Sequence, residues 1–443
     1  MSACIVAWSS AVAAQPAGEP EAPDKQQQEP AQQRQAQPER DAPVVWSFDA
    51  QLRPRAEART NHSFGLEPDE RAYFGRDTFA TISQRTRLGL GAELDELSAY
   101  AQLQHAGEWG LTGGDALTDP VVGLHQAWLN YAPSEQWSLR AGRQELAYGD
   151  QRVLGTVGWS QTGRAWDAVR LGVQPNDALG FDLFVGRYAA GAVESDFALD
   201  SSLFDGDAYL TGAYFTVRDL LEPAFDELDV YALYDAQIDD LSDDDPNRQN
   251  RVGLGARLAG KWNIVDATVE GMYQLGSQCV ADDDGCTDET TDISAWFIDS
   301  ELGVMAYEPN AVRLFVGFSH ATGDDPETAD TDEGYFQFYP TAHKWLGFMD
   351  IIGPRTNIQE VRGGLGLRAG SFNVRESVHY FRRLEPEAET VGLEFDTTVS
   401  TKLTDELALG VGHGLFLPSE GASTNGDAEG AANWFYVQMN AAF

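Results

Sequence analysis

Apolar and ionic side chains alternate one by one over residues 46–59. The even positions are Trp46, Phe48, Ala50, Leu52, Pro54, Ala56 and Ala58, and the odd positions are Ser47, Asp49, Gln51, Arg53, Arg55, Glu57 and Arg59. Successive side chains of a β-strand point to opposite faces, so this segment has one apolar face and one ionic face. Such a strand suits a wall between hydrocarbon and water.

The alternation recurs along the chain and predicts about eighteen strands. We expect them near 46–59, 81–94, 97–109, 121–132, 136–147, 163–174, 178–188, 207–218, 226–237, 249–261, 264–276, 292–306, 310–320, 356–369, 371–383, 391–402, 405–417 and 432–443. Short gaps, such as 95–96, alternate with long ones, of which 321–355 is the longest. An even strand count with this asymmetry is typical of outer-membrane barrels, with short periplasmic turns and long extracellular loops. The sequence therefore predicts an all-β fold, a transmembrane antiparallel β-barrel; a soluble all-β protein is the alternative.

The first 43 residues differ from the rest. Residues 3–14 are mostly small and apolar, and Ala11-Val12-Ala13 has the small-x-small pattern of a signal-peptidase site. We expect a signal peptide at 1–14, truncated because the positive n-region is missing, then a disordered Gln/Pro/Glu-rich linker at 15–43 and the barrel at 44–443. The predicted location is the outer membrane of a Gram-negative-type envelope.

The formal net charge of −40, from 30 Lys+Arg and 70 Asp+Glu, excludes nucleic acid as a partner. Much of the acid falls in predicted outer loops, in the ranges 239–245, 282–289 and 324–333. Solvated surface is one interpretation. The other is Ca²⁺ bound at these loops, although the spacing of a helical calcium loop is absent. Cys279 and Cys286 lie in one predicted outer loop, where an oxidising compartment favours a disulfide over two free thiols.

Many arginines occupy the ionic positions of the predicted strands. An arginine that faced lipid at mid-bilayer would cost about 2–4 kcal/mol, so we expect these side chains in the lumen. They are Arg53, Arg55, Arg85, Arg87, Arg140, Arg164, Arg170, Arg251, Arg257, Arg362, Arg368 and Arg375. Some are expected to pair with lumenal acids. As a set, arginine favours forked recognition of carboxylates or phosphates, and a basic lumen lowers the barrier to anions.

No catalytic motif is complete. Gly158–Gly163 has one residue too many for a nucleophile elbow. Gly255–Lys261 begins like a phosphate-binding loop, but Trp262 stands where Ser or Thr is required. The seven histidines have no metal-ligand spacing. We therefore predict no enzyme activity, no catalytic residues, no metal site and no cofactor.

Several segments resemble the alginate export family of outer-membrane porins. They are Gln84–Gly89, Gly123–Leu129, Gly142–Gly155, Trp159–Leu171 and Tyr339–Asp350. The resemblance implies an 18-stranded monomeric barrel with an arginine-lined conduit that passes a polyuronate chain, and loops that act as gates. On the matching positions it places Arg85, Arg87, Arg143, Arg152, Arg164 and Arg170 at the conduit or its outer mouth. The chain departs from the family in its acidic loops and in the acids that share its lumen.

The predicted function is an outer-membrane channel for an alginate-like polyuronate or another anionic polysaccharide or oligosaccharide. The expected conduit residues are Arg53, Arg55, Arg85, Arg87, Arg143, Arg152, Arg164, Arg170, Arg362, Arg368 and Arg375. Expected partners are outer-membrane lipid, the anionic polysaccharide and periplasmic secretion components. A general small-solute porin, a barrel enzyme and an adhesive surface protein are the alternatives. Residues 339–350 either fold into the pore or pack as an extracellular loop.

Overall fold

The computed structural model describes residues 43–61, 78–109, 121–189, 207–221, 225–238, 249–282, 285–307, 310–328, 330–422 and 430–443. The predicted signal peptide and all of the predicted linker except Pro43 lie outside these ranges. Within them, no helix is long and apolar enough to cross a membrane.

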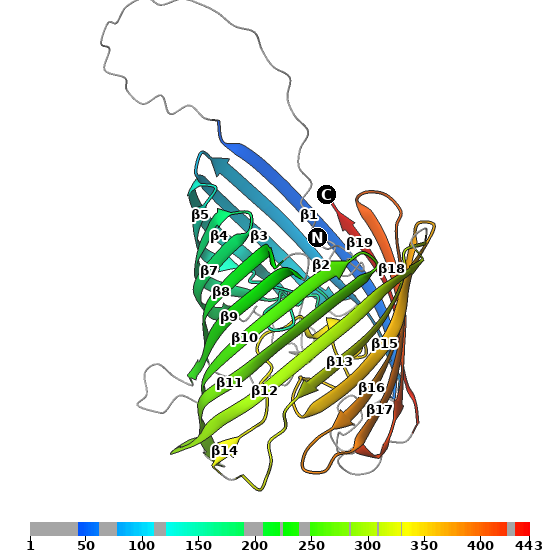
Figure 1. Cartoon of the computed structure of the whole chain (residues 1–443). Coiled ribbons are helices and arrows are strands. Elements are labelled where there is room, and N and C mark those ends of the chain that lie inside the picture. Colours follow the sequence, from blue (N-terminus) through cyan, green and yellow to red (C-terminus); the bar gives the residue numbers. More distant parts are fainter. Residues whose placement is uncertain are drawn as a thin grey trace, which may run out of the picture.

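All described strands belong to one sheet, which closes into an 18-stranded antiparallel β-barrel (Figure 1). The wall consists of β1 (Val45–Thr60), β2 (Thr78–Leu94), β3 (Leu97–Glu108), β4 (Val121–Ser134), β5 (Trp137–Gln144), β6 (Ala165–Asn176), β7 (Leu179–Ala189), β8 (Asp207–Leu221), β9 (Phe225–Ile238), β10 (Gln249–Trp262), β11 (Val265–Asp282), β12 (Gly285–Tyr307), β13 (Val312–Ala321), β15 (Ile358–Ala369), β16 (Phe372–Arg383), β17 (Thr390–Lys402), β18 (Leu407–Pro418) and β19 (Ala432–Ala442). The two-residue β14 (Thr331–Asp332) pairs with β12 in parallel. Two short 3₁₀ helices, Ala342–Lys344 and Glu420–Ala422, complete the elements of the described residues.

The wall closes where β1 meets β19. These strands pair antiparallel, and Ala50 and Phe443 exchange backbone hydrogen bonds of 3.1 and 2.9 Å. Closure gives each described strand of the wall a hydrogen-bonded neighbour on both sides, which is the condition for a sheet to cross a bilayer. The predicted barrel is thus confirmed.

The two faces of the wall follow the alternation of the sequence. On β1, Arg53 and Arg55 are buried in the lumen, whereas Phe48 and Leu52 are exposed on the outside. Exposed aromatic rings lie toward both ends of the outer surface, as expected of girdles at the two membrane interfaces. They are Trp46, Phe48, Tyr131, Trp137, Tyr307 and Phe372 toward the short turns, and Tyr234, Tyr273, Trp296, Phe318, Tyr380 and Phe435 toward the long connections.

Each predicted strand segment coincides with a strand of the wall, but one predicted loop does not exist. The gap 277–291 was expected as a long loop, yet β11 continues to Asp282 and β12 begins at Gly285. Cross-strand pairing continues through this stretch, for example between Gln278 and Thr291. The β-branched residues Thr290 and Thr291 favour the extended pairing. The result is a long hairpin in place of the loop.

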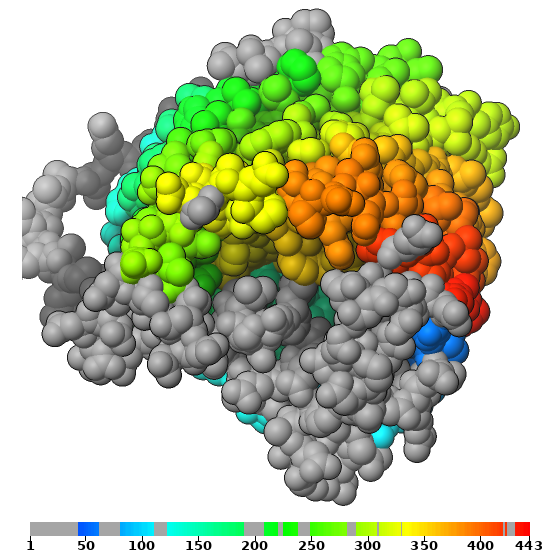
Figure 2. All heavy atoms as spheres, turned by 90° about the horizontal axis from the view of Figure 1, so that it is seen from below, coloured from blue at the N-terminus to red at the C-terminus, as the bar shows by residue number. Residues whose placement is uncertain are grey.

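Two long connections fold into the barrel. Inner loop 1 (residues 145–164) joins β5 to β6, and inner loop 2 (residues 322–357) joins β13 to β15 and contains β14. Figure 2 views the barrel from the end with the long connections, where yellow residues of inner loop 2 lie beside residues of the rim. Within inner loop 2, the Tyr339 hydroxyl donates to Asp235 of β9 at 2.7 Å, and the Met349 amide donates to Glu394 of β17 at 2.8 Å. Residues 339–350 therefore fold into the pore.

Candidate functional site

Inner loop 1 crosses the lumen from one wall to the other. Near its start, Asp150 pairs with Arg257 of β10 at 3.0 Å. Further along, Arg152 forms an ion pair with Asp299 of β12 at 3.2 Å. The following residues 158–162 reach the opposite wall, at β1 and β2. This loop therefore divides the bore into an outer part and a periplasmic part.

Arginines of β1 and β2 bind the backbone of inner loop 1. Arg53 donates to the carbonyl oxygens of Gly158 (2.6 Å), Trp159 (2.9 Å) and Ser160 (2.6 Å). Arg85 donates to the Ser160 carbonyl at 3.1 Å. Hydrogen bonds from a charged donor are roughly twice as strong as neutral ones, and these connect segments that are far apart in sequence. The wall arginines thus fix the position of the loop.

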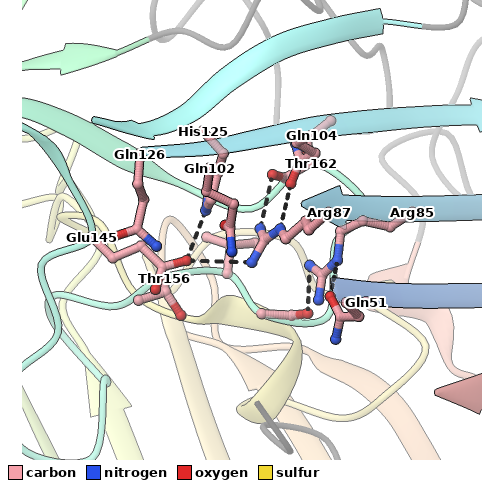
Figure 3. Close-up of polar contacts among 12 residues, drawn as sticks. Gln51, Arg85, Arg87, Gln102, Gln104, His125, Gln126, Glu145, Thr156 and Thr162 are labelled. Atoms are coloured by element: carbon pink, nitrogen blue, oxygen red, sulfur yellow. Dashed lines mark hydrogen bonds and ion pairs between the residues drawn. The ribbon is translucent and has the colours of Figure 1, made fainter. Parts of the chain in front are cut away.

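Arg55 and Arg87 extend the same arrangement. Arg55 donates to the Trp159 carbonyl at 2.9 Å, and its guanidinium carbon lies 4.0 Å from the ring centroid of Trp159. Arg87 binds Gln104 at 2.7 Å and lies 3.6 Å from Glu145 (Figure 3). Glu145 also contacts His125 at 2.8 Å. Burial raises the pKa of Glu145, but His125 and Arg87 outweigh it and hold this pKa below its ordinary value.

The two inner loops bind each other. The Tyr339 amide donates to the Val153 carbonyl at 2.9 Å, and the Gly155 amide donates to the Tyr339 carbonyl at 2.8 Å. Arg164 joins both loops, because its Nη1 donates to the carbonyl oxygens of Gly155 and Pro340. Burial, together with the nearby Asp235 carboxylate, raises the pKa of Tyr339 well above its ordinary value. The loops therefore form one constriction.

Aromatic stacking adds to this contact. The rings of Trp159 and His343 stack with centroids 4.2 Å apart, and Trp434 of β19 packs edge-on against both. Nδ1 of His343 lies 2.8 Å from Asp350 Oδ2. Trp159 and Trp166 are both buried, so they pack inside the constriction instead of offering open faces to a sugar.

A buried ionic cluster surrounds Asp299 of β12. Arg362 of β15 donates to Asp299 at 2.8 Å and to Glu360 at 2.9 Å. Arg152 and Arg355, one from each inner loop, lie 3.2 and 3.5 Å from the same carboxylate. Breaking a buried pair leaves an uncompensated charge, so each partner fixes the others. Arg152 and Arg362 are consequently neutralised within the protein.

Inner loop 1 carries a second charged contact at Asp150. Burial raises the pKa of this carboxyl, but Arg257, Arg152 and Lys344 lower it more, so the pKa lies below its ordinary value. Burial lowers the pKa of the Lys344 ammonium, which donates to the Asp150 carbonyl at 3.2 Å. The ionised carboxylate of Asp150 thus binds inner loop 1 to Arg257 of β10.

The remaining predicted conduit residues occupy different places. Arg170 faces the lumen, where Asp182 accepts from it at 3.0 and 2.8 Å. Arg368 is exposed near the end of β15, at the periplasmic rim. Arg375 of β16 faces the lumen with its guanidinium 4.6 Å from the ring centroid of Phe315.

Arg143 is a correction to the sequence-based prediction. It shares the face of Leu139 and Ala141, and the register sets it beside Asp167, which accepts from it at 2.8 and 2.7 Å. Leu139 is exposed on the outside of the wall. Arg143 therefore points out of the barrel, where its pairing with Asp167 reduces the cost of a charge near lipid.

The cysteine and metal predictions concern the outer end. Cys279 lies in β11 and is disulfide-bonded. Cys286 is in β12, with its backbone opposite Ala281, and its side chain lies outside the described residues. The pairing of Cys279 with Cys286 stays a prediction.

Among described side chains, no group of three or more His, Cys, Asp or Glu could hold a metal. The acidic range 239–245 is not among them.

Comparison with known proteins shows which family this chain belongs to. A family model described as alginate export matches residues 44–404. The chain belongs to the alginate export family. A search of curated proteins found no match to this chain.

Solved outer-membrane porins share the fold of this member of the alginate export family. OccK9 (OpdG) of Pseudomonas aeruginosa aligns with a TM-score of 0.61 at 10% identity over 90% of this chain and 98% of that chain. OccK2 (OpdF) of P. aeruginosa, solved in complex with glucuronate, gives 0.61 at 9% identity over 90% and 98%. OccAB4 of Acinetobacter baumannii gives 0.58 at 13% identity over 89% and 97%. This family member is an outer-membrane channel, and its family and fold are of the channel type.

Proposed function

We propose that this channel passes an anionic polysaccharide or oligosaccharide of the alginate-like polyuronate class. The observation that carries the proposal is an arginine-rich lumen in a member of the alginate export family. Guanidinium groups match carboxylates in geometry and charge, and a polyuronate presents one carboxylate per sugar. The glucuronate bound to the structurally similar OccK2 supports a uronate as the repeating unit.

A general small-solute porin is the second candidate. It is favoured by the pairing inside the lumen, because Asp299, Glu270 and Glu360 together offset the charges of Arg152, Arg355 and Arg362. Asp182 likewise offsets the charge of Arg170. Paired arginines contribute little net positive potential to a bore. Such a channel would show weak ion selectivity and no preference for uronates.

Single-channel recording separates these functions. The refolded barrel is inserted into planar bilayers, and the reversal potential is measured in a KCl gradient. An oligomannuronate is then compared with a neutral malto-oligosaccharide of equal length. A polyuronate channel is expected to prefer anions and to be blocked by the oligouronate alone. Weak selectivity or a preference for cations, with equal or no block by the two oligosaccharides, would establish the general porin instead.

A further inference from the structure

The arginines of the lumen differ in whether other groups of the protein bind their guanidinium N–H donors. Near the constriction, Arg362 and Arg257 bind several carboxylates, and Arg53 binds loop carbonyls. By contrast, Arg140 of β5 and Arg375 of β16 make no hydrogen bond or ion pair with any residue that the structure describes, and the Nε atom of each is buried without a partner. These two guanidinium groups retain donors for an external anion.

Arg140 lies on an aromatic platform beside a second arginine. Its guanidinium carbon is 4.0 Å from the ring centroid of Trp128, whose ring is 5.7 Å from that of Tyr100. The strand register sets Arg140 directly opposite Arg170 of β6. Arg170 is already bound by Asp182, so the unbalanced positive charge at this place is that of Arg140.

Arg375 repeats the arrangement on another strand. It lies over Phe315 at 4.6 Å. Glu301, the acid whose charge acts most on Arg375, is bound by Arg313 at 2.9 Å and by Arg362 at 3.5 Å. Stacking on a ring holds a guanidinium flat while the N–H groups at its edge stay free. Arg375 therefore presents the same kind of donor set as Arg140.

Both arginines lie in the periplasmic half of the barrel. Each stands three residues after the first residue of a strand that follows a short turn, Trp137 in β5 and Phe372 in β16. The strand order places β5 and β16 on opposite sides of the closed wall. The charge of Arg375 acts on Lys344 of inner loop 2, and Arg170, opposite Arg140, lies 5.7 Å from the Tyr148 ring of inner loop 1. A solute from the periplasm would therefore meet both guanidinium groups as it arrived at the inner loops.

We propose that Arg140 and Arg375 form a two-sided capture site for the carboxylates of a polyanion that enters from the periplasm. This inference rests on the proposed function and deepens it. A polyuronate carries a carboxylate on every sugar, so the chain can bind either wall as it advances. Each site is a single arginine, and weak, separate sites allow a chain to leave as well as to enter.

The test compares the two sides of the membrane. An oligomannuronate is added to either side of a planar bilayer that holds channels in one orientation. For the wild type, block is expected at a lower concentration from the side of the short turns. Arg140→Gln and Arg375→Gln are each expected to raise this blocking concentration roughly tenfold, the equivalent of one charge-assisted hydrogen bond. Block from the other side should change less.

Arg218→Gln is the matched control. It removes the same charge from the periplasmic end, but Arg218 is already bound by Glu227 at 3.0 Å. The heat-dependent shift of the folded barrel on an SDS gel verifies that each variant folds. Arg140→Lys and Arg375→Lys keep the charge and should restore part of the block.

The outcomes separate the inference from the function on which it rests. If the wild type is blocked equally from both sides, or if Arg218→Gln weakens block as much as Arg140→Gln, the capture site is refuted while the polyuronate channel stands. If the oligouronate blocks the wild type from neither side, the proposed function fails, and the capture site fails with it.

Discussion

Arg53 of β1 donates a hydrogen bond of 2.6 Å from Nη1 to the carbonyl oxygen of Gly158 in inner loop 1. The two residues are 105 positions apart in the sequence. A wall arginine expected to bind a passing solute is instead occupied by the protein's own backbone. This contact makes the width of the bore depend on wall arginines.

The double variant Arg53→Gln/Arg85→Gln is expected to enlarge the channel. It removes charge-assisted hydrogen bonds, each worth about 1.5–3 kcal/mol, that hold residues 158–160 against the wall. Inner loop 1 should then move, and single-channel recordings should show a higher and noisier conductance. Arg382→Gln is the control, because Arg382 is exposed at the end of β16. A double variant as quiet and as narrow as the wild type would refute the role assigned to these arginines.

Acid is expected to loosen the same loop through Asp150. The pKa of Asp150 is lower in the folded protein than in the unfolded chain. Its contribution to stability is therefore present above the unfolded pKa and is lost as the pH falls through the folded value. Below about pH 4 the conductance should become noisier. Asp150→Asn should show this noise already at pH 7, and a quiet variant would show that the carboxylate does not hold the loop.

Arg143→Ala is expected to leave ion selectivity unchanged. Arg143 points out of the barrel toward Asp167, so its charge does not face the bore. Arg170→Ala is the comparison, because Arg170 faces the lumen beside Arg140. Reversal potentials in a KCl gradient measure both variants. A clear loss of anion preference in Arg143→Ala alone would contradict the outward orientation.

Gly142→Ala is expected to destabilise the barrel. Gly142 has φ of +119°, and an added Cβ would collide with the backbone oxygen of Ala127. Such strain costs on the order of 1–3 kcal/mol. The temperature at which the folded band disappears from an SDS gel should fall. Gly123→Ala should leave that temperature unchanged, since its added Cβ would meet nothing within 4 Å. Equal temperatures for the two variants would contradict the strain.

The sequence predicted the wall well because alternation is a local property of each strand. Arg53 and Arg362 were placed on the lumenal side by this pattern alone, and both are buried there. Alternation also puts Arg143 on the face of Leu139 and Ala141, so the pattern contained the correct orientation, and the family resemblance obscured it.

The constriction could not be predicted in the same way. Inner loops 1 and 2 have no periodicity, and their positions depend on contacts such as the pairing of Gly155 with Tyr339, far apart in the chain. The alternation placed Arg140 in the lumen, but the residues near it in the sequence did not show whether its guanidinium group forms an ion pair. That difference depends on which acids lie on neighbouring strands.

The hairpin of β11 and β12 has a practical consequence for studies on living cells. Its strands have 18 and 23 residues, about twice the length that a bilayer crossing requires. The backbone of Asp282 and of Gly285, on either side of the turn, therefore lies well clear of the lipid. A peptide epitope inserted at this turn should be reached by antibodies on whole bacteria, which offers a direct means of counting assembled copies without opening the envelope.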